Sequence, residues 1–169
     1  MEYDRIDKKK IMLLSLYLDV CNTHASRLKM AYSHVKHLYP MEVGTFVRLK
    51  DDEIGFMELL INRFSKLQDV IGAKIFPMLV ELLQPETKGS SFLDVLHQLE
   101  KLDLLPSSKL WIDMREFCNR LIYECLEYPD FTASNCNQAI LASQELLQYW
   151  EGLQGKAHNI KEEWNRQLS

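Results

Sequence analysis

Apolar residues recur along this chain at steps of three and four, the spacing that places side chains on one face of an α-helix. Runs that alternate apolar and polar residues, which predict β-strands, are almost missing. Only six glycines and five prolines interrupt the helical pattern. The sequence therefore predicts an all-α protein, folded as an antiparallel up-and-down bundle of four to five helices with short connections.

The first half of the chain predicts two long helices. The first covers residues 3–38 and ends before a proline. The second follows a linker over residues 39–50, begins with an N-cap at Asp51 or Asp52 and extends to about Gln84. Their apolar seams are formed by Ile11, Leu14, Leu18, Cys21, Ala25, Leu28, Ala31 and Val35, and by Met57, Leu60, Ile61, Phe64, Leu67, Ile71, Ile75, Met78 and Leu82.

The second of these helices contains two residues that change its local structure. Pro77 has no N–H and removes one backbone hydrogen bond, so we expect a kink near Phe76. Gly72 has no side chain and permits a close approach by a neighbouring helix. Because both residues lie in the C-terminal half of the helix, we expect its irregular part there.

Shorter helices are predicted in the second half. A loop over residues 85–91 precedes a short helix that is capped by Ser91 and ends near Leu104. After a turn and cap at residues 106–108, a fourth helix runs over residues 109–128 and stops at a proline. Thr132 or Ser134 opens the last helix. Its stripe is formed by Cys136, Ile140, Ser143, Leu147 and Trp150.

Composition narrows the class of protein. A chain of 169 residues, 47% of them apolar, is expected to form one domain over residues 1–169. A net charge of −4 disfavours coating of nucleic acid by bulk electrostatics, so that any such contact has to be local. The sequence contains no apolar signal segment and no apolar run of the roughly 20 residues that span a membrane, which predicts a cytoplasmic protein. Its four cysteines form no C-x-x-C pair, and we expect reduced, mostly buried thiols.

On a helical wheel the fourth helix divides into an apolar stripe and a polar border. The border consists of Arg115, Asn119 and Tyr123 at positions i, i+4 and i+8, which place a cation, an amide and a phenol in one row. This row either faces a groove or a partner, or it consists of ordinary surface residues with local partners. The stripe contains Trp111, Met114, Cys118, Leu121, Ile122 and Cys125.

Histidines and charged residues elsewhere suggest weaker candidates. Three histidines, His24, His34 and His37, are possible metal ligands. No carboxylate or cysteine lies beside them at the spacing of a metal site, so we predict neither a metal nor a cofactor. On the second long helix, Lys66 and Asp69 either contribute to a polar cleft together with Arg63 or form a surface ion pair.

Three separated segments resemble HEPN-domain proteins of the HepT kind. The pattern W-x-x-M-R-E-x-C-N-R-x-I-x-E, which begins at Trp111, is similar to the motif helix of that family. Residues 61–77, I-N-R-F-S-K-L-Q-D-V-I-G-A-K-I-F-P, resemble its long second helix, and residues 92–105, F-L-D-V-L-H-Q-L-E-K-L-D-L-L, resemble the short helix between them. The segments occur in the order found in the family and cover roughly half of the chain.

The resemblance implies a small helical bundle that forms a homodimer, with two motif helices meeting at a cleft. Active members of the family resemble metal-independent RNA endonucleases, in which an arginine and a histidine act on the phosphate. Such proteins are paired with a minimal nucleotidyltransferase antitoxin, which in some pairs adds AMP to a tyrosine of the motif.

This chain departs from the family pattern at the residues that carry the chemistry. In an ungapped alignment, Cys118 replaces the expected arginine, Tyr123 the expected histidine, and Cys125 the tyrosine that receives AMP. A tyrosine, with an ordinary pKa of about 10, is a poor proton shuttle near neutral pH. Arg115 and Arg120 remain as groups that can hold phosphate, so the candidate catalytic residues are Arg115, Asn119, Arg120 and Tyr123.

The sequence therefore supports three hypotheses. The first is a HepT-like interaction protein with a degenerate ribonuclease site, which dimerises and binds a nucleotidyltransferase antitoxin. The second is an active, metal-independent RNA endonuclease toxin with a rearranged site. The third is a module that binds a nucleotide or another substrate for a nucleotidyltransferase. We rank the interaction protein first.

Overall fold

The computed structural model describes the backbone of residues 2–124 and 129–168 and the side chains of residues 8–121 and 132–168. All regular elements within these ranges are helical. They are α1 (Glu2–Val35), η1 (Lys36–Leu38), α2 (Val43–Phe46), α3 (Asp51–Val70), η2 (Ile71–Ile75), α4 (Phe76–Leu83), η3 (Pro85–Thr87), α5 (Phe92–Lys101), α6 (Ser108–Glu124) and α7 (Pro129–Gln167). The predicted all-α fold is confirmed. Cys125, the position that corresponds to the modified tyrosine, lies outside the described residues.

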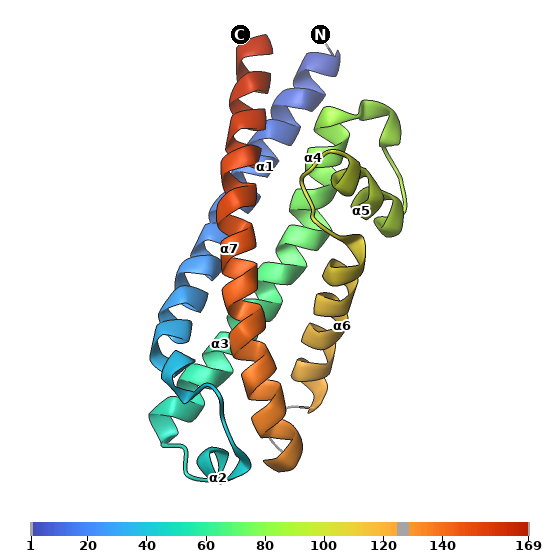
Figure 1. Cartoon of the computed structure of the whole chain (residues 1–169). Coiled ribbons are helices and arrows are strands. Elements are labelled where there is room, and N and C mark those ends of the chain that lie inside the picture. The colour runs from blue at the N-terminus through green and yellow to red at the C-terminus, as the bar shows by residue number, and fades with distance from the viewer. Residues whose placement is uncertain (1, 125–128, 169) are drawn as a thin grey trace.

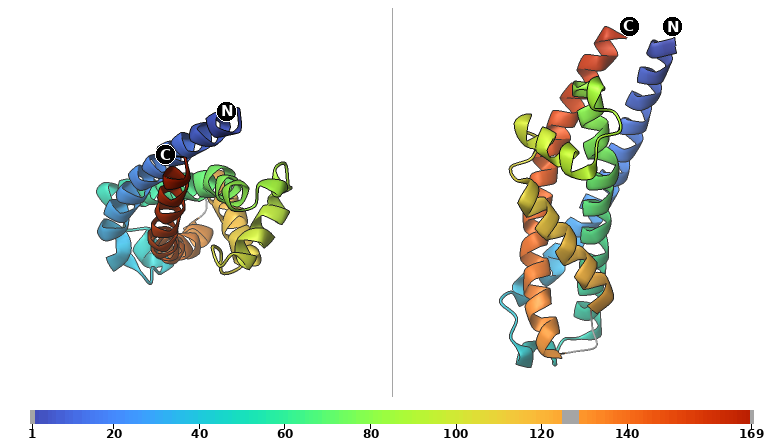
Figure 2. Two further views of the ribbon diagram at one scale, coloured as in Figure 1. Left: turned by 90° about the horizontal axis from the view of Figure 1, so that it is seen from above. Right: turned by 90° about the vertical axis from the view of Figure 1, so that its right-hand side faces the viewer.

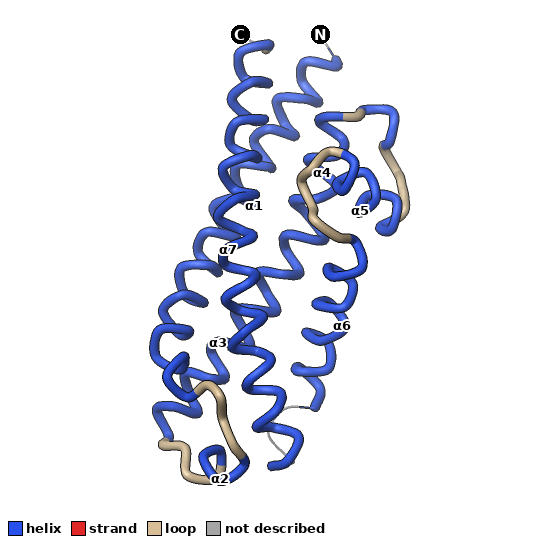
Figure 3. Tube along the Cα trace, in the orientation of Figure 1, coloured by secondary structure: helices blue, strands red, loops and turns tan. Residues whose placement is uncertain are grey.

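The long helices alternate in direction. Figure 1 shows α1 running away from the N-terminus, α3 and α4 returning, α6 descending and α7 returning to the end of the bundle where the chain began. The same antiparallel order is visible from above and from the side (Figure 2). The short α5 packs against α4 and α6 on the outside of the bundle, and a loop beside α4 leads from α5 into α6 (Figure 3). The predicted helical bundle is therefore present, and the short helix α5 is added on its outside.

Helix α3 occupies the centre of the bundle. It packs against α1, α6 and α7, because its apolar seam is wide enough to face all three. The largest side chains that are almost completely buried are Phe64, Phe76, Leu14, Leu28, Leu60, Leu67, Ile71, Ile75, Leu79, Leu96, Leu99 and Leu121. Both predicted seams thus form the core, and Ala25 and Met78 are the members that remain half-buried.

The irregularity expected in the second long helix is a π-helical turn. In η2 the N–H of Phe76 donates to the carbonyl of Ile71, five residues earlier instead of four. Pro77 follows directly and has no N–H to donate to Gly72, the next carbonyl in that register. The helix therefore changes its hydrogen-bond register one turn before the proline, and α4 continues from Phe76.

The connection between α1 and α3 is more ordered than the linker that the sequence predicts. It contains the short helix α2, which packs against α7. The side chain of Asn137 on α7 fixes this connection at Met41: its Oδ1 accepts from the Met41 N–H at 2.7 Å, and its Nδ2 donates to the Met41 carbonyl at 2.8 Å. One amide side chain thereby satisfies both polar groups of a buried backbone unit.

Two of the predicted helix starts are wrong and two are confirmed. Helix α3 has Lys50 at its N-cap, whose N–H donates to Glu53 at 2.9 Å, so neither Asp51 nor Asp52 provides the cap. In a capping box, the side chain of the third helical residue accepts a hydrogen bond from the N–H of the N-cap residue. Glu53 makes this contact with Lys50. Helix α7 begins at Pro129, because a proline is favoured in the first helical turn, and not at Thr132 or Ser134.

The confirmed caps are both serines. Ser91 Oγ accepts from the Asp94 N–H at 3.2 Å, and the Asp94 carboxylate accepts from the Ser91 N–H at 3.3 Å. Ser91 Oγ also donates to the Asp94 carboxylate at 2.5 Å, and this bond, together with the bond from the Ser91 N–H, holds the pKa of Asp94 below its ordinary value. Ser107 Oγ accepts from the Leu110 N–H at 3.2 Å at the start of α6.

In the described parts of the chain, no helix is both long enough and apolar enough to cross a membrane.

We predict that Asn137→Ala lowers the free energy of unfolding by roughly 2 kcal/mol or more, because it leaves the N–H and the carbonyl of Met41 without partners. The measurement is urea denaturation followed by circular dichroism. Asn159→Ala, at an exposed position of the same helix, is the matched control and should change stability little. Equal effects of the two substitutions would contradict the role given to Asn137.

Candidate functional site

The N-terminus of α6 is tied to the end of α5. The carboxylate of Glu100, near the end of α5, accepts from the Ser108 N–H at 2.7 Å. This hydrogen bond to the backbone lowers the pKa of Glu100. Helix α6 then packs against α3 and α5. Because its start is anchored, the side chains of its first two turns have a defined position relative to α3.

Trp111 joins α6 to the centre of the bundle. Its side chain is 3% exposed and packs between the rings of Phe76 on α4 and Tyr149 on α7, with centroid distances of 4.6 and 5.8 Å. On a third side it lies against Gly72, where an added Cβ would be 3.2 Å from the indole nitrogen. Gly72 is therefore needed for the close helix approach that the sequence predicts at this position.

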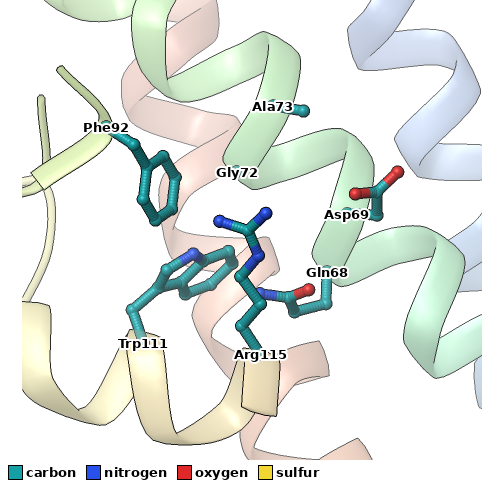
Figure 4. A pocket seen from close by; sticks show the side chains of 7 residues that line it. All are labelled: Gln68, Asp69, Gly72, Ala73, Phe92, Trp111 and Arg115. Atoms are coloured by element: carbon teal, nitrogen blue, oxygen red, sulfur yellow. The ribbon is translucent and has the colours of Figure 1, made fainter. Parts of the chain in front are cut away.

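A pocket of about 160 Å³ opens beside Trp111, between η2 and α6. Figure 4 shows its walls: α3 and η2 form one side, Phe92 of α5 closes the top, and Trp111 and Arg115 of α6 form the other side. The lining residues are Gln68, Asp69, Gly72, Ala73, Phe92, Trp111 and Arg115. Three helical segments that are distant in the sequence thus contribute to one small site.

Arg115 is the only cation among these lining residues. Its guanidinium carbon lies 4.8 Å from the centroid of the Phe92 ring, which is the distance of a cation–π contact. Asp69 also lines the pocket, but its carboxylate points away from the guanidinium (Figure 4). No ion pair links Arg115 to a carboxylate within residues 8–121 and 132–168. Among the described residues, the guanidinium thus has the Phe92 ring as its charge-dependent contact, while the Asp69 carboxylate lines the same pocket beyond ion-pair distance.

Two buried polar groups accompany Arg115. The Trp111 Nε1–H has no hydrogen-bond partner among the described residues. Gln68 is 3% exposed and extends its amide from α3 toward α6 (Figure 4). A buried donor without an acceptor costs free energy comparable to a lost hydrogen bond. The pocket thus combines apolar walls with donors that converge on a small volume.

The four residues expected from the sequence do not all meet in this pocket. Arg115 lines it, while Asn119 is exposed on the next turn of the same side of α6. Arg120 is exposed on another side, with its guanidinium 5.8 Å from the Phe117 ring, so the two arginines contact different rings. The side chain of Tyr123 lies outside the described residues. Arg115 and Arg120 are therefore not arranged as one phosphate clamp.

Several pocket residues have no strong sequence signal. Gln68 and Ala73 look like ordinary members of a helix, and Phe92 looks like an apolar residue after a cap. Besides Arg115, the sequence indicated Gly72, because a glycine inside an apolar seam indicates close packing. Asp69, one of the charged residues assigned either to a polar cleft or to a surface pair, lines the pocket, and no ion pair joins it to Lys66 among the described side chains.

Cys118, which takes the place of the family's arginine, belongs to the core. Its side chain is 2% exposed, and burial raises its pKa to about 12. A buried thiol with such a pKa is protonated near neutral pH and is a poor nucleophile. The predicted assignment of Cys118 to the apolar stripe is therefore confirmed.

The three histidines of α1 and η1 have separate partners. His24 Nδ1 accepts from Arg63 at 3.0 Å, and burial together with the charges of Arg63 and Lys66 lowers the pKa of His24. The ring of His34 stacks on Phe56, and His37 lies 3.4 Å from the carboxylate of Glu53. Across the described side chains, no group of three or more His, Cys, Asp or Glu residues has the geometry to hold a metal ion.

Comparisons with protein-family models, curated proteins and solved structures found no match for this chain.

We predict that Gly72→Ala lowers stability or leaves it unchanged, whereas Gly55→Ala raises it by roughly 0.5–1 kcal/mol. A Cβ at Gly55 meets nothing within 4 Å, so the substitution gains only helix propensity. At Gly72 the Cβ presses on Trp111, which Phe76 and Tyr149 prevent from moving away. Urea denaturation measures both variants, and an equal gain in stability would contradict the close packing of Trp111.

Proposed function

We propose that this protein is a non-catalytic helical interaction module that dimerises through the groove between α6 and α7. The proposal depends on one observation: an apolar groove of about 330 Å³ separates these two helices. It is lined by Leu105, Pro106, Ser107, Leu110, Trp111, Asp113, Met114, Ala142, Glu145 and Tyr149. Exposed apolar grooves of this kind are typical of surfaces that bind a helix.

The packing of α6 explains why the groove exists. The close neighbours of α6 are α3 and α5, and its contact with α7 includes the rings of Trp111 and Tyr149. Leu110 stands at the edge of the groove with 63% of its surface exposed. A leucine costs free energy in water, so burial of Leu110 by a partner would be favourable.

A second copy of the chain suits this groove. An isologous dimer brings the same surface together twice, so the surface has to be complementary to itself. Along α6, Lys109 forms an ion pair with Asp113, which lines the groove together with Glu145. Both charged residues of the lining are acidic, so a symmetric contact would need Lys109, which lies beside the groove on α6, to reach Glu145 of the second copy. The resemblance to HepT-type proteins supports the same proposal, because their motif helices meet in a dimer.

The resemblance extends the proposal to a second partner. A minimal nucleotidyltransferase would bind the dimer as its antitoxin, through protein contacts and without modification of a motif tyrosine. Asn119 and Arg120 are exposed on α6 and remain available to such a partner. Co-purification with a small nucleotidyltransferase encoded by the adjacent gene tests this part of the proposal.

The chemistry around Arg115 favours binding over RNA cleavage. Cleavage requires a base for the 2′-hydroxyl, an acid for the leaving oxygen and a cation for the developing charge. The residues that line the pocket supply one cation and one carboxylate, and none of them is a histidine. Cys118 is buried with a raised pKa and does not provide a second reactive group.

We predict that Leu110→Lys converts a dimer into a monomer, because it places a charge in the groove. Leu93→Lys is the matched control: Leu93 is 47% exposed on α5 and does not line the groove. Light scattering at micromolar concentration measures the mass of each variant. A monomeric wild-type protein, or equal effects of the two substitutions, would refute the proposed interface.

We also predict that the purified protein leaves RNA intact in the absence of metal ions, because Asp69 is the one residue of the pocket lining that can transfer a proton, whereas cleavage needs both an acid and a base. Incubation with a mixed RNA substrate, followed by electrophoresis, makes the measurement. Cleavage that Arg115→Ala abolishes and Lys109→Ala preserves would replace the interaction proposal with the endonuclease hypothesis.

A further inference from the structure

We propose that the pocket between η2 and α6 binds a small organic carboxylate, with Arg115 and Trp111 as the donors. This site goes beyond the proposed dimer. The groove lies on the α7 side of α6, whereas the pocket lies on the α3 side. Dimerisation through the groove would leave the pocket open, so the two proposals can fail independently.

The first support is the position of the Arg115 guanidinium, which is exposed and lines the pocket together with a single carboxylate, Asp69. The guanidinium lies over Phe92 at 4.8 Å and forms no ion pair with any described carboxylate. A guanidinium that is held against a ring keeps its edge N–H groups available, and these match the two oxygens of a carboxylate. The ring therefore orients the cation without using the donors that would bind a ligand.

A second donor is already directed at the same space. The indole nitrogen of Trp111 is buried and has no acceptor within the described parts of the chain. Figure 4 shows it on the edge of the ring that faces the interval between Phe92 and Arg115. Because this nitrogen has almost no accessible surface in the structure, a ligand oxygen that accepts from both groups requires a small displacement of the ring, and it would then recover the free energy cost of the unpaired indole N–H.

Size and lining favour an organic carboxylate over phosphate. A cavity of about 150 Å³ holds a benzene-sized molecule, and this pocket has a volume of about 160 Å³. Phe92, Trp111 and Ala73 offer apolar surface to a hydrocarbon body. A phosphate dianion carries more charge and more acceptor oxygens than one arginine and one indole can satisfy. The expected ligand is thus a monoacid with a flat or short apolar body.

Such a carboxylate has two sources: a free organic acid or the acidic side chain of a peptide. Benzoate represents the first source, and N-acetylglutamate N-methylamide represents the second. Benzamide has the shape of benzoate without its charge, and inorganic phosphate has the charge without the apolar body. The four probes therefore separate the contributions of charge, shape and source.

The test is titration of the full-length protein with each probe, followed by calorimetry and by the indole N–H resonances in a ¹⁵N correlation spectrum. We expect benzoate to bind with a dissociation constant on the order of millimolar, as suits so small a ligand. The Trp111 indole signal should shift, while those of Trp150 and Trp164 stay in place. Benzamide and phosphate should bind at least about tenfold more weakly than benzoate, because benzamide lacks the negative charge and phosphate lacks the apolar body.

Two variants locate the binding. Arg115→Gln should weaken benzoate binding at least about tenfold. Arg120→Gln, on the same helix but outside the pocket lining, should leave it unchanged. Trp111→Phe removes the indole N–H while retaining a ring, and it assigns the shifting resonance.

Several results would overturn the proposal: no shift of the Trp111 signal with either acid, equal binding of benzamide, tighter binding of phosphate, or equal effects of the two arginine substitutions. Stronger binding of benzoate than of the glutamate derivative would identify a free acid as the source. The reverse order would identify an acidic side chain. Because the Trp111 signal is read on folded protein, loss of folding in a variant cannot imitate loss of binding.

Discussion

The position of α6 depends on the contact between Trp111 and Gly72. A helix joined to its neighbours by loops can pack at many heights and rotations, and a large ring seated against a glycine removes most of that freedom. Trp111 also contacts Phe76 and Tyr149, so a single side chain links α6 to α4 and to α7. The two cavities on either side of α6 follow from this arrangement, because Trp111 lines both of them.

The π turn adjoins the same contact. Gly72 lies inside η2, where the backbone changes from a four-residue to a five-residue hydrogen-bond register ahead of Pro77. A π turn widens a helix locally and leaves backbone carbonyls with fewer donors. Here the widened turn also carries the residue without a side chain, so the indole can approach the backbone. Pro77, Gly72 and Trp111 have different effects on local structure, and all three act at the contact between η2 and α6.

The family resemblance and the packing lead to different views of α6. The motif-like residues Arg115, Asn119 and Arg120 suggested one polar surface. In the structure, Arg115 turns toward α3 and Phe92, whereas Arg120 lies over Phe117. Cys118, at the position of an expected arginine, is enclosed by the core. The side of α6 that faces α3 and Phe92 thus carries one cation beside largely apolar walls.

The sequence by itself determined the helices, their approximate ends and the residues that form the core, because these depend on periodicity and on capping within a few residues of chain. It also identified Gly72 as a point of close approach. Only the tertiary structure decided what surrounds Arg115: Phe92, Gly72 and Trp111 come from three segments whose meeting depends on how the helices cross. The clamp of Asn137 on Met41 was missed for the same reason, because it joins α7 to a connection 96 residues away. The N-cap at Lys50 and the start of α7 at Pro129 are local features, and there the sequence offered several capping residues of similar preference.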